Sequence, residues 1–156
     1  MSSYRPVVRL AVLSLLICGL LFPLLITALA QVFFPYQAGG EIVQLNGASI
    51  GSNLIAQNFT KPIFFYERND SASGFDPDIT LQDAYSQIPR ISSAIFERAQ
   101  ALNVTGISLD SLRDSLNEII NQNEEGTFWI FGSPYVNVLR INLALIKTYP
   151  SIYEGV

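Results

Sequence analysis

The 156-residue chain has no histidine, a single cysteine and a single tryptophan. Without histidine it lacks the commonest metal ligand and the commonest general base at neutral pH. The one cysteine, Cys18, falls in an apolar run, so the rest of the chain has no disulfide framework and no thiolate site. The sequence also shows no internal repeat, glycine-rich phosphate loop or nucleophile–base pair. These absences predict a chain that is not an enzyme on its own.

Charge is missing from one long stretch: no charged residue occurs between Arg9 and Glu41. As one helix, residues 10–34 would be about 37 Å long, which is enough to cross a bilayer with some tilt. A lone span must satisfy its backbone polar groups internally, so a helix is the expected form. The sequence therefore predicts a transmembrane helix over residues 10–34, whose only polar side chains are Ser14, Thr27 and Gln31.

Basic residues set the expected orientation of this span. Arg5 and Arg9 precede it, and basic residues stay on the cytoplasmic side of a membrane. We therefore expect a single-pass protein of the cell membrane, with residues 1–9 cytoplasmic and residues 35–156 extracytoplasmic. The alternative is a cleaved signal peptide, since Ala28-Leu29-Ala30 resembles a cleavage site. The apolar run exceeds the usual length of about 7–15 residues for such peptides, which favours a retained anchor.

Two residues within the span indicate a partner helix. Pro23 removes one helical hydrogen bond and is expected to kink the helix. Gly19, one turn earlier, would allow another helix to approach closely. An isolated anchor needs neither residue. Pro35 is expected to stop the helix at the membrane boundary.

The rest of the chain, about 120 residues, is the length of one ordinary domain. All 13 acidic residues but only seven of the nine basic residues follow the span, which gives this part a net charge of −6. An acidic, exported domain is a poor partner for nucleic acid. The predicted fold class is α+β, with few short strands and three to four helices.

Local patterns place these elements. A hairpin is expected from residues 42–45 to 48–50 around Asn46-Gly47, and a buried strand over residues 127–131. Thr80 and Ser108 have the form of helix N-caps, and residues 124–126 are expected to end the helix after Ser108. Pro89 either kinks the first of these helices or begins a second one. Residues 135–141 alternate in places like a strand, but Asn137 is a good N-cap, so a closing helix is favoured.

The segment Asp76-Pro77-Asp78-Ile79-Thr80 matches the D-x-D-x-T pattern of aspartyl-phosphate phosphatases. In those enzymes the first aspartate attacks phosphate from the end of a buried strand. No apolar strand leads into Asp76, so a capped helix start explains the aspartates better. A cation site formed by Asp76, Asp78 and Asp83 is a further alternative to a solvated acidic loop.

Three triplets have the form of N-glycosylation acceptors, although such triplets often occur by chance. They begin at Asn58, Asn69 and Asn103. The aromatic clusters 64–66 and 129–131 are candidates for a partner surface or, more commonly in a small domain, for the core.

Several short pieces, in order along most of the chain, resemble the C subunit of the Kdp potassium-transporting P-type ATPase, the KdpC family. Around the span and just after it they are Gly19, Pro23-Leu24-Leu25, Ala30-Gln31, Phe34-Pro35, Gln37-Ala38, Gly40, Gly51-Ser52, Leu54-Ile55 and Gln57-Asn58-Phe59-Thr60. Later they are Ser73-Gly74-Phe75-Asp76, Tyr85, Gln87-Ile88-Pro89-Arg90, Val136-Asn137-Val138 and Asn142-Leu143-Ala144-Leu145. One departure stands out: typical members carry a long Ser/Gly/Asn-rich segment plus a helix between the pieces matching Arg68 and Ser73-Gly74, and this chain lacks both.

The resemblance implies a non-catalytic subunit of a high-affinity, ATP-driven potassium uptake complex. Its partners would be a channel-like subunit that binds potassium and a P-type ATPase subunit that uses ATP and Mg²⁺. The C subunit is described as supporting assembly and as raising the ATPase subunit's affinity for ATP. By this analogy Gln87 is the candidate nucleotide contact, and Gly19, Pro23, Gln31 and Pro35 are candidates for docking to membrane or partner. The alternative is an anchored extracytoplasmic binding domain unrelated to potassium transport.

Overall fold

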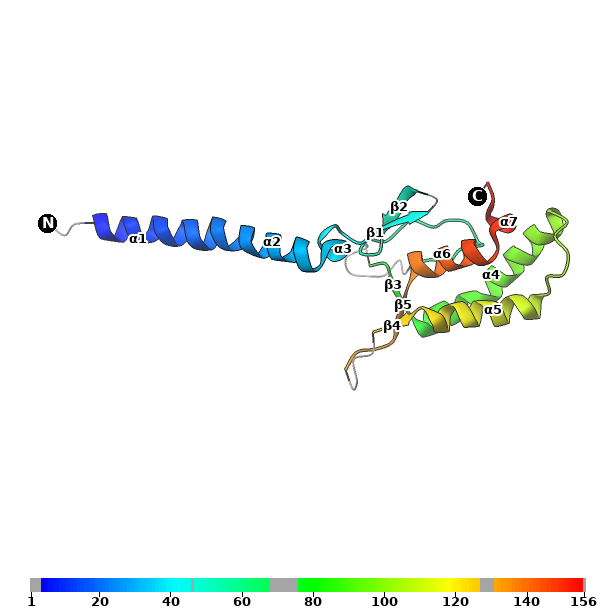
Figure 1. Cartoon of the computed structure of the whole chain (residues 1–156). Helices are drawn as coiled ribbons and strands as arrows, with labels where there is room; N and C mark the ends of the chain where they lie inside the picture. The colour runs from blue at the N-terminus through cyan, green and yellow to red at the C-terminus, as the bar shows by residue number, and fades with distance from the viewer. Residues whose placement is uncertain (1–3, 46, 68–75, 127–130, 156) are drawn as a thin grey trace. The chain divides into compact units, whose positions relative to one another are not determined.

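The computed structural model describes residues 4–45, 47–67, 76–126 and 131–155. The chain divides into two compact units, Met1–Ile42 and Val43–Val156. The first unit is mainly one long helix, and the second combines short strands with several helices, as Figure 1 shows. The predicted α+β class is confirmed.

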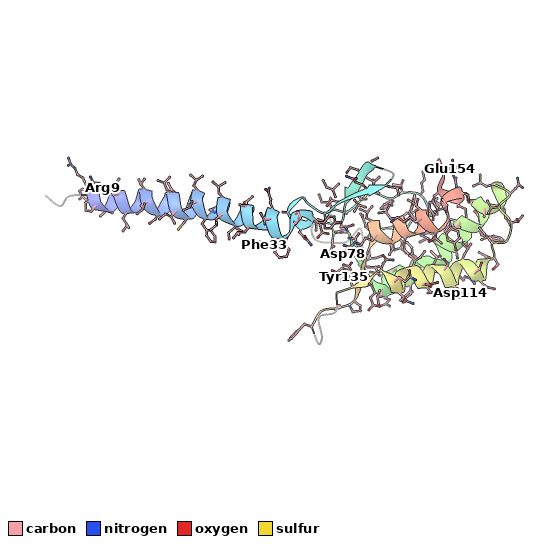
Figure 2. All side chains as sticks on the ribbon, viewed as in Figure 1. Arg9, Phe33, Asp78, Asp114, Tyr135 and Glu154 are labelled. Atoms are coloured by element: carbon pink, nitrogen blue, oxygen red, sulfur yellow. The ribbon has the colours of Figure 1, made fainter. Side chains whose placement is uncertain are left out.

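The first unit contains one apolar helix of 29 residues, Arg5–Phe33. It consists of α1 (Arg5–Leu16), the π-helical turn η1 (Ile17–Leu21) and α2 (Phe22–Phe33). At 1.5 Å per residue its length is about 43 Å, which is sufficient to cross a bilayer. The helix begins five residues before the apolar run, so Arg5 and Arg9 lie in its first turns. Figure 2 labels Arg9 and Phe33 towards its two ends.

The turn η1 lies directly before Pro23 and explains how the helix passes the proline. The N–H of Phe22 donates to the carbonyl of Ile17, five residues back instead of the usual four. The helical hydrogen-bond ladder therefore widens by one residue next to Pro23, which has no N–H to donate. The helix is continuous through Pro23, and its hydrogen-bond ladder widens in the turn before the proline. The hydroxyl of Thr27 also donates to the Pro23 carbonyl at 2.9 Å.

The helix ends at Phe34, whose φ of −136° leaves the helical region. Pro35 then begins a short helix, α3 (Pro35–Ala38), rather than only ending the previous one. Proline suits a first helical position because its fixed φ is already helical and its missing N–H is not needed there. Gly40 and Glu41 follow with positive φ values of 81° and 48°, which turns the chain.

The predicted hairpin is present as β1 (Ile42–Leu45) paired with β2 (Ala48–Ser52). Gly47 has a φ of 81°, as a tight hairpin turn requires, while Asn46 lies outside the described residues.

A second sheet has three antiparallel strands in the order β3-β5-β4. The central strand β5 (Tyr135–Asn137) pairs with β3 (Asp78–Thr80) and with β4 (Glu124–Glu125). Figure 2 labels Asp78 and Tyr135 on the adjacent strands β3 and β5. The prediction that residues 124–126 only end a helix was incomplete, because Glu124 and Glu125 pair with β5 directly after that helix. The strand predicted over residues 127–131 lies almost wholly outside the described residues.

The helix that follows β3 contacts both β3 and β5 of this sheet. Helix α4 (Leu81–Ala101) is continuous through Pro89, so the proline starts no second helix. Helix α5 (Leu109–Gln122) packs along α4, and its N-cap Ser108 forms a capping box with Ser111. The predicted N-cap at Thr80 is confirmed, because its hydroxyl accepts from the N–H of Asp83 at 3.1 Å.

The closing segment is both a strand and a helix. After β5 the chain enters α6 (Val138–Thr148), with Asn137 as N-cap, and ends with α7 (Pro150–Tyr153). Buried apolar side chains from these elements form one core: Ile63, Phe64, Phe65, Ile79, Ala84, Ile88, Ile91, Ile95, Ala99, Leu112, Leu116, Ile119, Ile120, Val136, Val138, Ile141, Leu145, Ile152 and Tyr153.

Candidate functional site

Two side-chain amides hold the aromatic segment 62–66, which we call the latch segment. Asn142 of α6 donates to the Phe65 carbonyl at 3.0 Å and accepts from its N–H at 2.8 Å. Gln87 of α4 likewise donates to the Tyr66 carbonyl at 3.0 Å and accepts from the Tyr66 N–H at 2.8 Å. Each amide therefore satisfies both backbone groups of one residue, as a neighbouring β-strand would. The latch segment is fixed to two helices without belonging to a sheet.

Arg90, one turn after Gln87, completes this arrangement. Its guanidinium donates to the carbonyls of Pro62 at 2.6 Å and Phe64 at 3.0 Å, and to Gln87 Oε1 at 2.7 Å. It also lies over the Tyr66 ring, with Cζ 3.9 Å from the centroid. Burial lowers the pKa of Arg90 from its ordinary value, and the nearby Tyr66 opposes that shift.

These contacts occupy the hydrogen-bonding groups of the Gln87 side chain. Its Oε1 accepts from both the Tyr66 N–H and Arg90, which uses the two lone pairs of that oxygen. Its amide nitrogen donates to the Tyr66 carbonyl. The observed contacts of Gln87 are thus within its own chain. The i, i+3 spacing of Gln87 and Arg90 was visible in the sequence, but their common target 21 to 28 residues away was not.

The acidic segment is organised by capping and by the sheet. Asp76 Oδ1 accepts from the N–H of Asp78 at 3.0 Å. Asp78 in turn accepts from Asn137 Nδ2 at 2.9 Å, which ties β3 to the N-cap of α6. Burial raises the pKa of Asp78, and the nearby Asp76 adds to that rise while the bond from Asn137 opposes it.

The positions of these aspartates test two hypotheses for residues 76–83, a phosphatase nucleophile at Asp76 and a cation site. Asp76 is exposed and lies two residues before the short strand β3, not at the end of a buried strand, so its placement differs from that of a phosphatase nucleophile. Within residues 4–45, 47–67, 76–126 and 131–155, no group of three His, Cys, Asp or Glu side chains could hold a metal ion. The alternative of a cation site at Asp76, Asp78 and Asp83 is therefore not formed among the described residues.

The residues predicted to dock in the membrane all lie in the first unit. Gly19 is in the widened turn, Pro23 and Gln31 are in α2, and Pro35 begins α3. A Cβ placed on Gly19 would meet only Leu15 Cδ1, at 3.7 Å, so the helix itself does not require glycine there. All four side-chain positions are exposed within this chain.

The structure describes the aromatic cluster 64–66 in full and only Phe131 of the cluster 129–131. Phe64 and Phe65 are buried in the core, as favoured for that cluster, and Phe64 packs against Tyr153 with ring centroids 5.3 Å apart. Of the second cluster, residues 129 and 130 lie outside the described residues, and Phe131 is 71 % exposed.

Comparison with known proteins gives the family. The family model described as the c chain of the K⁺-transporting ATPase, KdpC, matches residues 4–71 and 69–147, which is most of the chain. The chain belongs to the KdpC family. Curated relatives agree: a potassium-transporting ATPase KdpC subunit of Polynucleobacter asymbioticus is 31 % identical, over 92 % of this chain and 97 % of its own length. Similar subunits of Thermoplasma acidophilum and Staphylococcus aureus are each 28 % identical, over 94 % of this chain.

The same comparisons show that this chain is shorter than its KdpC relatives by an internal segment. The alignments to the Thermoplasma and Staphylococcus subunits extend over 198 and 200 positions, although this chain has 156 residues. The relatives therefore carry residues that have no counterpart here. The two stretches matched by the KdpC model meet at residues 69–71, which agrees with the missing segment noted after Arg68. The latch segment, Gln87 and Asn142 all lie within the matched stretches.

Proposed function

We propose that this chain is the non-catalytic subunit of an ATP-driven potassium uptake complex. In this complex it supports the assembly of a channel-like potassium-binding subunit and a P-type ATPase subunit. The observation that carries the proposal is the KdpC match over residues 4–147 in a chain that also has a 29-residue apolar helix. ATP and Mg²⁺ would be used by the ATPase subunit, and potassium would be bound by the channel-like subunit.

Co-purification tests this assembly role. The full chain carrying an affinity tag, extracted in mild detergent, should retain a P-type ATPase chain and a channel-like chain. Isolation as a stable monomer under conditions that keep those two subunits together would contradict the proposal. That result would instead favour an anchored binding domain unrelated to potassium transport.

For orientation, we propose that the helix is retained as a single cell-membrane span with its N-terminal end in the cytoplasm. Arg5 and Arg9 support this direction, because basic residues flank the cytoplasmic end of a span. The second unit would then be extracytoplasmic. Protease added to sealed right-side-out vesicles should digest residues beyond Glu41, and digestion only in inside-out vesicles would reverse the assignment. A mature chain that begins after Ala30 would show instead that the helix is a signal peptide.

The proposed docking face includes Gly19, Pro23, Gln31 and Pro35. Gly19 supports it most directly, because the isolated helix has room for a side chain at that position. Gly19→Leu should lower the yield of assembled complex, while the matched variant Leu20→Ile leaves it unchanged. Equal yields of complex from Gly19→Leu and wild type would remove Gly19 from the interface.

The family's proposed effect on ATP affinity meets a physical obstacle in this orientation. The second unit, including Gln87, would lie across the membrane from cytoplasmic ATP. We therefore favour assembly and a position near the external potassium entry, where a domain with net charge −6 would raise the local cation concentration modestly. Gln87→Leu in the intact complex should lower its yield and leave the ATP concentration for half-maximal hydrolysis unchanged. A several-fold rise in that concentration at normal complex yield would favour nucleotide contact by Gln87.

A further inference from the structure

Two of the three N-x-Thr/Ser triplets lie in described parts of the second unit, and both have the same arrangement. In Asn58-Phe59-Thr60 and in Asn103-Val104-Thr105 the first and third residues are exposed. The middle residues, Phe59 and Val104, are partly buried and pack against the core. The asparagine and the threonine are therefore both accessible from outside the domain, while the residue between them fixes the triplet to it.

The Asn103 triplet forms the connection between α4 and α5. Asn103 has a φ of 55°, the left-handed conformation that asparagine adopts more readily than most residues, at the end of a helix. Its N–H donates to the Gln100 carbonyl at 3.1 Å, and the N–H of Val104 donates to the Ala99 carbonyl at 2.9 Å. The amide side chain thus projects from an ordered, exposed turn. Connecting loops run over the protein surface, where an enzyme can reach them.

The Asn58 triplet is held by aromatic residues of the latch segment. The ring of Phe59 packs on Phe64, with centroids 5.2 Å apart. The hydroxyl of Tyr66 donates to the Thr60 carbonyl at 3.0 Å, which leaves the side chains of Asn58 and Thr60 on the exposed side. Two triplets in different parts of the domain thus expose both the asparagine and the threonine.

We propose that Asn58 and Asn103 are acceptor sites for N-linked glycans. The donor class is an oligosaccharide joined through phosphate to a polyprenyl lipid, used by a membrane glycosyltransferase that acts outside the cytoplasm. The Asn amide nitrogen bonds to C1 of the first sugar and loses one proton, which passes to solvent. The C1–oxygen bond to phosphate breaks, and the lipid phosphate leaves with that electron pair. The threonine at the third position is the element that such enzymes recognise.

This inference rests on the extracytoplasmic orientation proposed above. In that orientation a hydrated sugar chain on an exposed turn is compatible with the fold, because neither Asn58 nor Asn103 contributes a buried side chain. Glycans at these two positions would also shield exposed connections of an anchored domain from proteases.

Mass spectrometry of glycopeptides tests the proposal on the full chain, purified with its complex from the membranes of cells that naturally produce it. The peptides that contain Asn58 and Asn103 should carry sugar, and the peptide that contains the exposed but triplet-free Asn121 should not. Thr105→Val should remove the glycan at Asn103 and leave that at Asn58, whereas Thr105→Ser should retain both. Unmodified Asn58 and Asn103 in the wild-type chain would overturn the proposal, and sugar at only one of them would overturn the other assignment.

A labelling experiment distinguishes an absence of glycosylation from a second unit that lies in the cytoplasm. In a Cys18→Ala background, Ser93→Cys places a thiol on the exposed surface of α4. A membrane-impermeant maleimide added to intact cells should label this thiol. Labelling without sugar at Asn58 and Asn103 would overturn glycosylation alone. A thiol that is labelled only after lysis would show that the domain is cytoplasmic, and both proposals would be wrong.

Discussion

The pair of hydrogen bonds between the Asn142 side chain and the Phe65 backbone provides a sharp test of how the second unit is held together. The Asn142 side chain is fully buried, and it satisfies both the N–H and the carbonyl of Phe65, which is also fully buried. Asn142→Leu keeps a side chain of similar size but removes both hydrogen bonds. The buried backbone groups of Phe65 then have no partner, because water does not reach them.

The expected cost follows from those two groups. Each unsatisfied buried polar group costs about 1–3 kcal/mol. The two groups together cost about 2–6 kcal/mol. Burial of the leucine side chain offsets about 1.5–3 kcal/mol of that total, which leaves a net loss centred on about 2 kcal/mol. Domains are stable by only about 5–15 kcal/mol, so the change is large. For a unit of this length the melting temperature should fall by about 4 °C for each kcal/mol lost.

Urea and thermal unfolding of the full chain in mild detergent would measure this loss. Near-ultraviolet circular dichroism is the suitable probe, because the apolar helix Arg5–Phe33 should keep its far-ultraviolet signal in detergent after the second unit unfolds. Gln100→Leu is the control: it replaces an exposed side-chain amide of α4 with leucine, and it should change the free energy of unfolding by less than about 0.5 kcal/mol. An Asn142→Leu protein as stable as this control would refute the argument that Asn142 holds the latch segment.

Three further substitutions have defined outcomes in the same unfolding assay. Thr80→Ala removes the N-cap of α4 and should cost about 1 kcal/mol, while Thr80→Ser should cost little. Gly126→Ala should destabilise β4 and β5, because φ is 96° there and a Cβ would lie 2.4 Å from Tyr135 Cδ1; a neutral effect would contradict this backbone conformation. The raised pKa of Asp78 means that its ionisation opposes folding, so this contribution to stability falls as the pH rises from the unfolded pKa of 3.8 through the folded value. Asp78→Asn keeps an acceptor for Asn137 and should flatten that dependence; an unchanged pH profile would show that Asp78 is not its source.

Sequence patterns predicted the elements whose causes are local. Thr80, Ser108 and Asn137 were each expected as N-caps, and each side chain accepts the expected backbone hydrogen bond. The apolar span and the first hairpin were predicted for the same reason, since hydropathy and turn chemistry act over a few residues. The docking residues, orientation and nucleotide contact remain predictions.

Elements whose causes lie far away in the chain were missed or left open. Glutamate is somewhat depleted in strands, and Glu124 and Glu125 form β4 because β5 supplies a pairing partner about ten residues later. Pro89 sits within a continuous helix because α4 is held on both sides of it by the core. The role of Asn142 could not be predicted, since its hydrogen-bond partner Phe65 is 77 residues away. No periodicity encodes such a contact.

We propose that a potassium-transporting ATPase requires this chain to assemble and to work. The direct measurement compares complexes purified from cells with and without this chain, for subunit content and for potassium-stimulated ATP hydrolysis. Without the chain, the channel-like and ATPase subunits should no longer purify together, and potassium should no longer stimulate hydrolysis. An intact two-subunit complex with full potassium-stimulated activity would contradict the account.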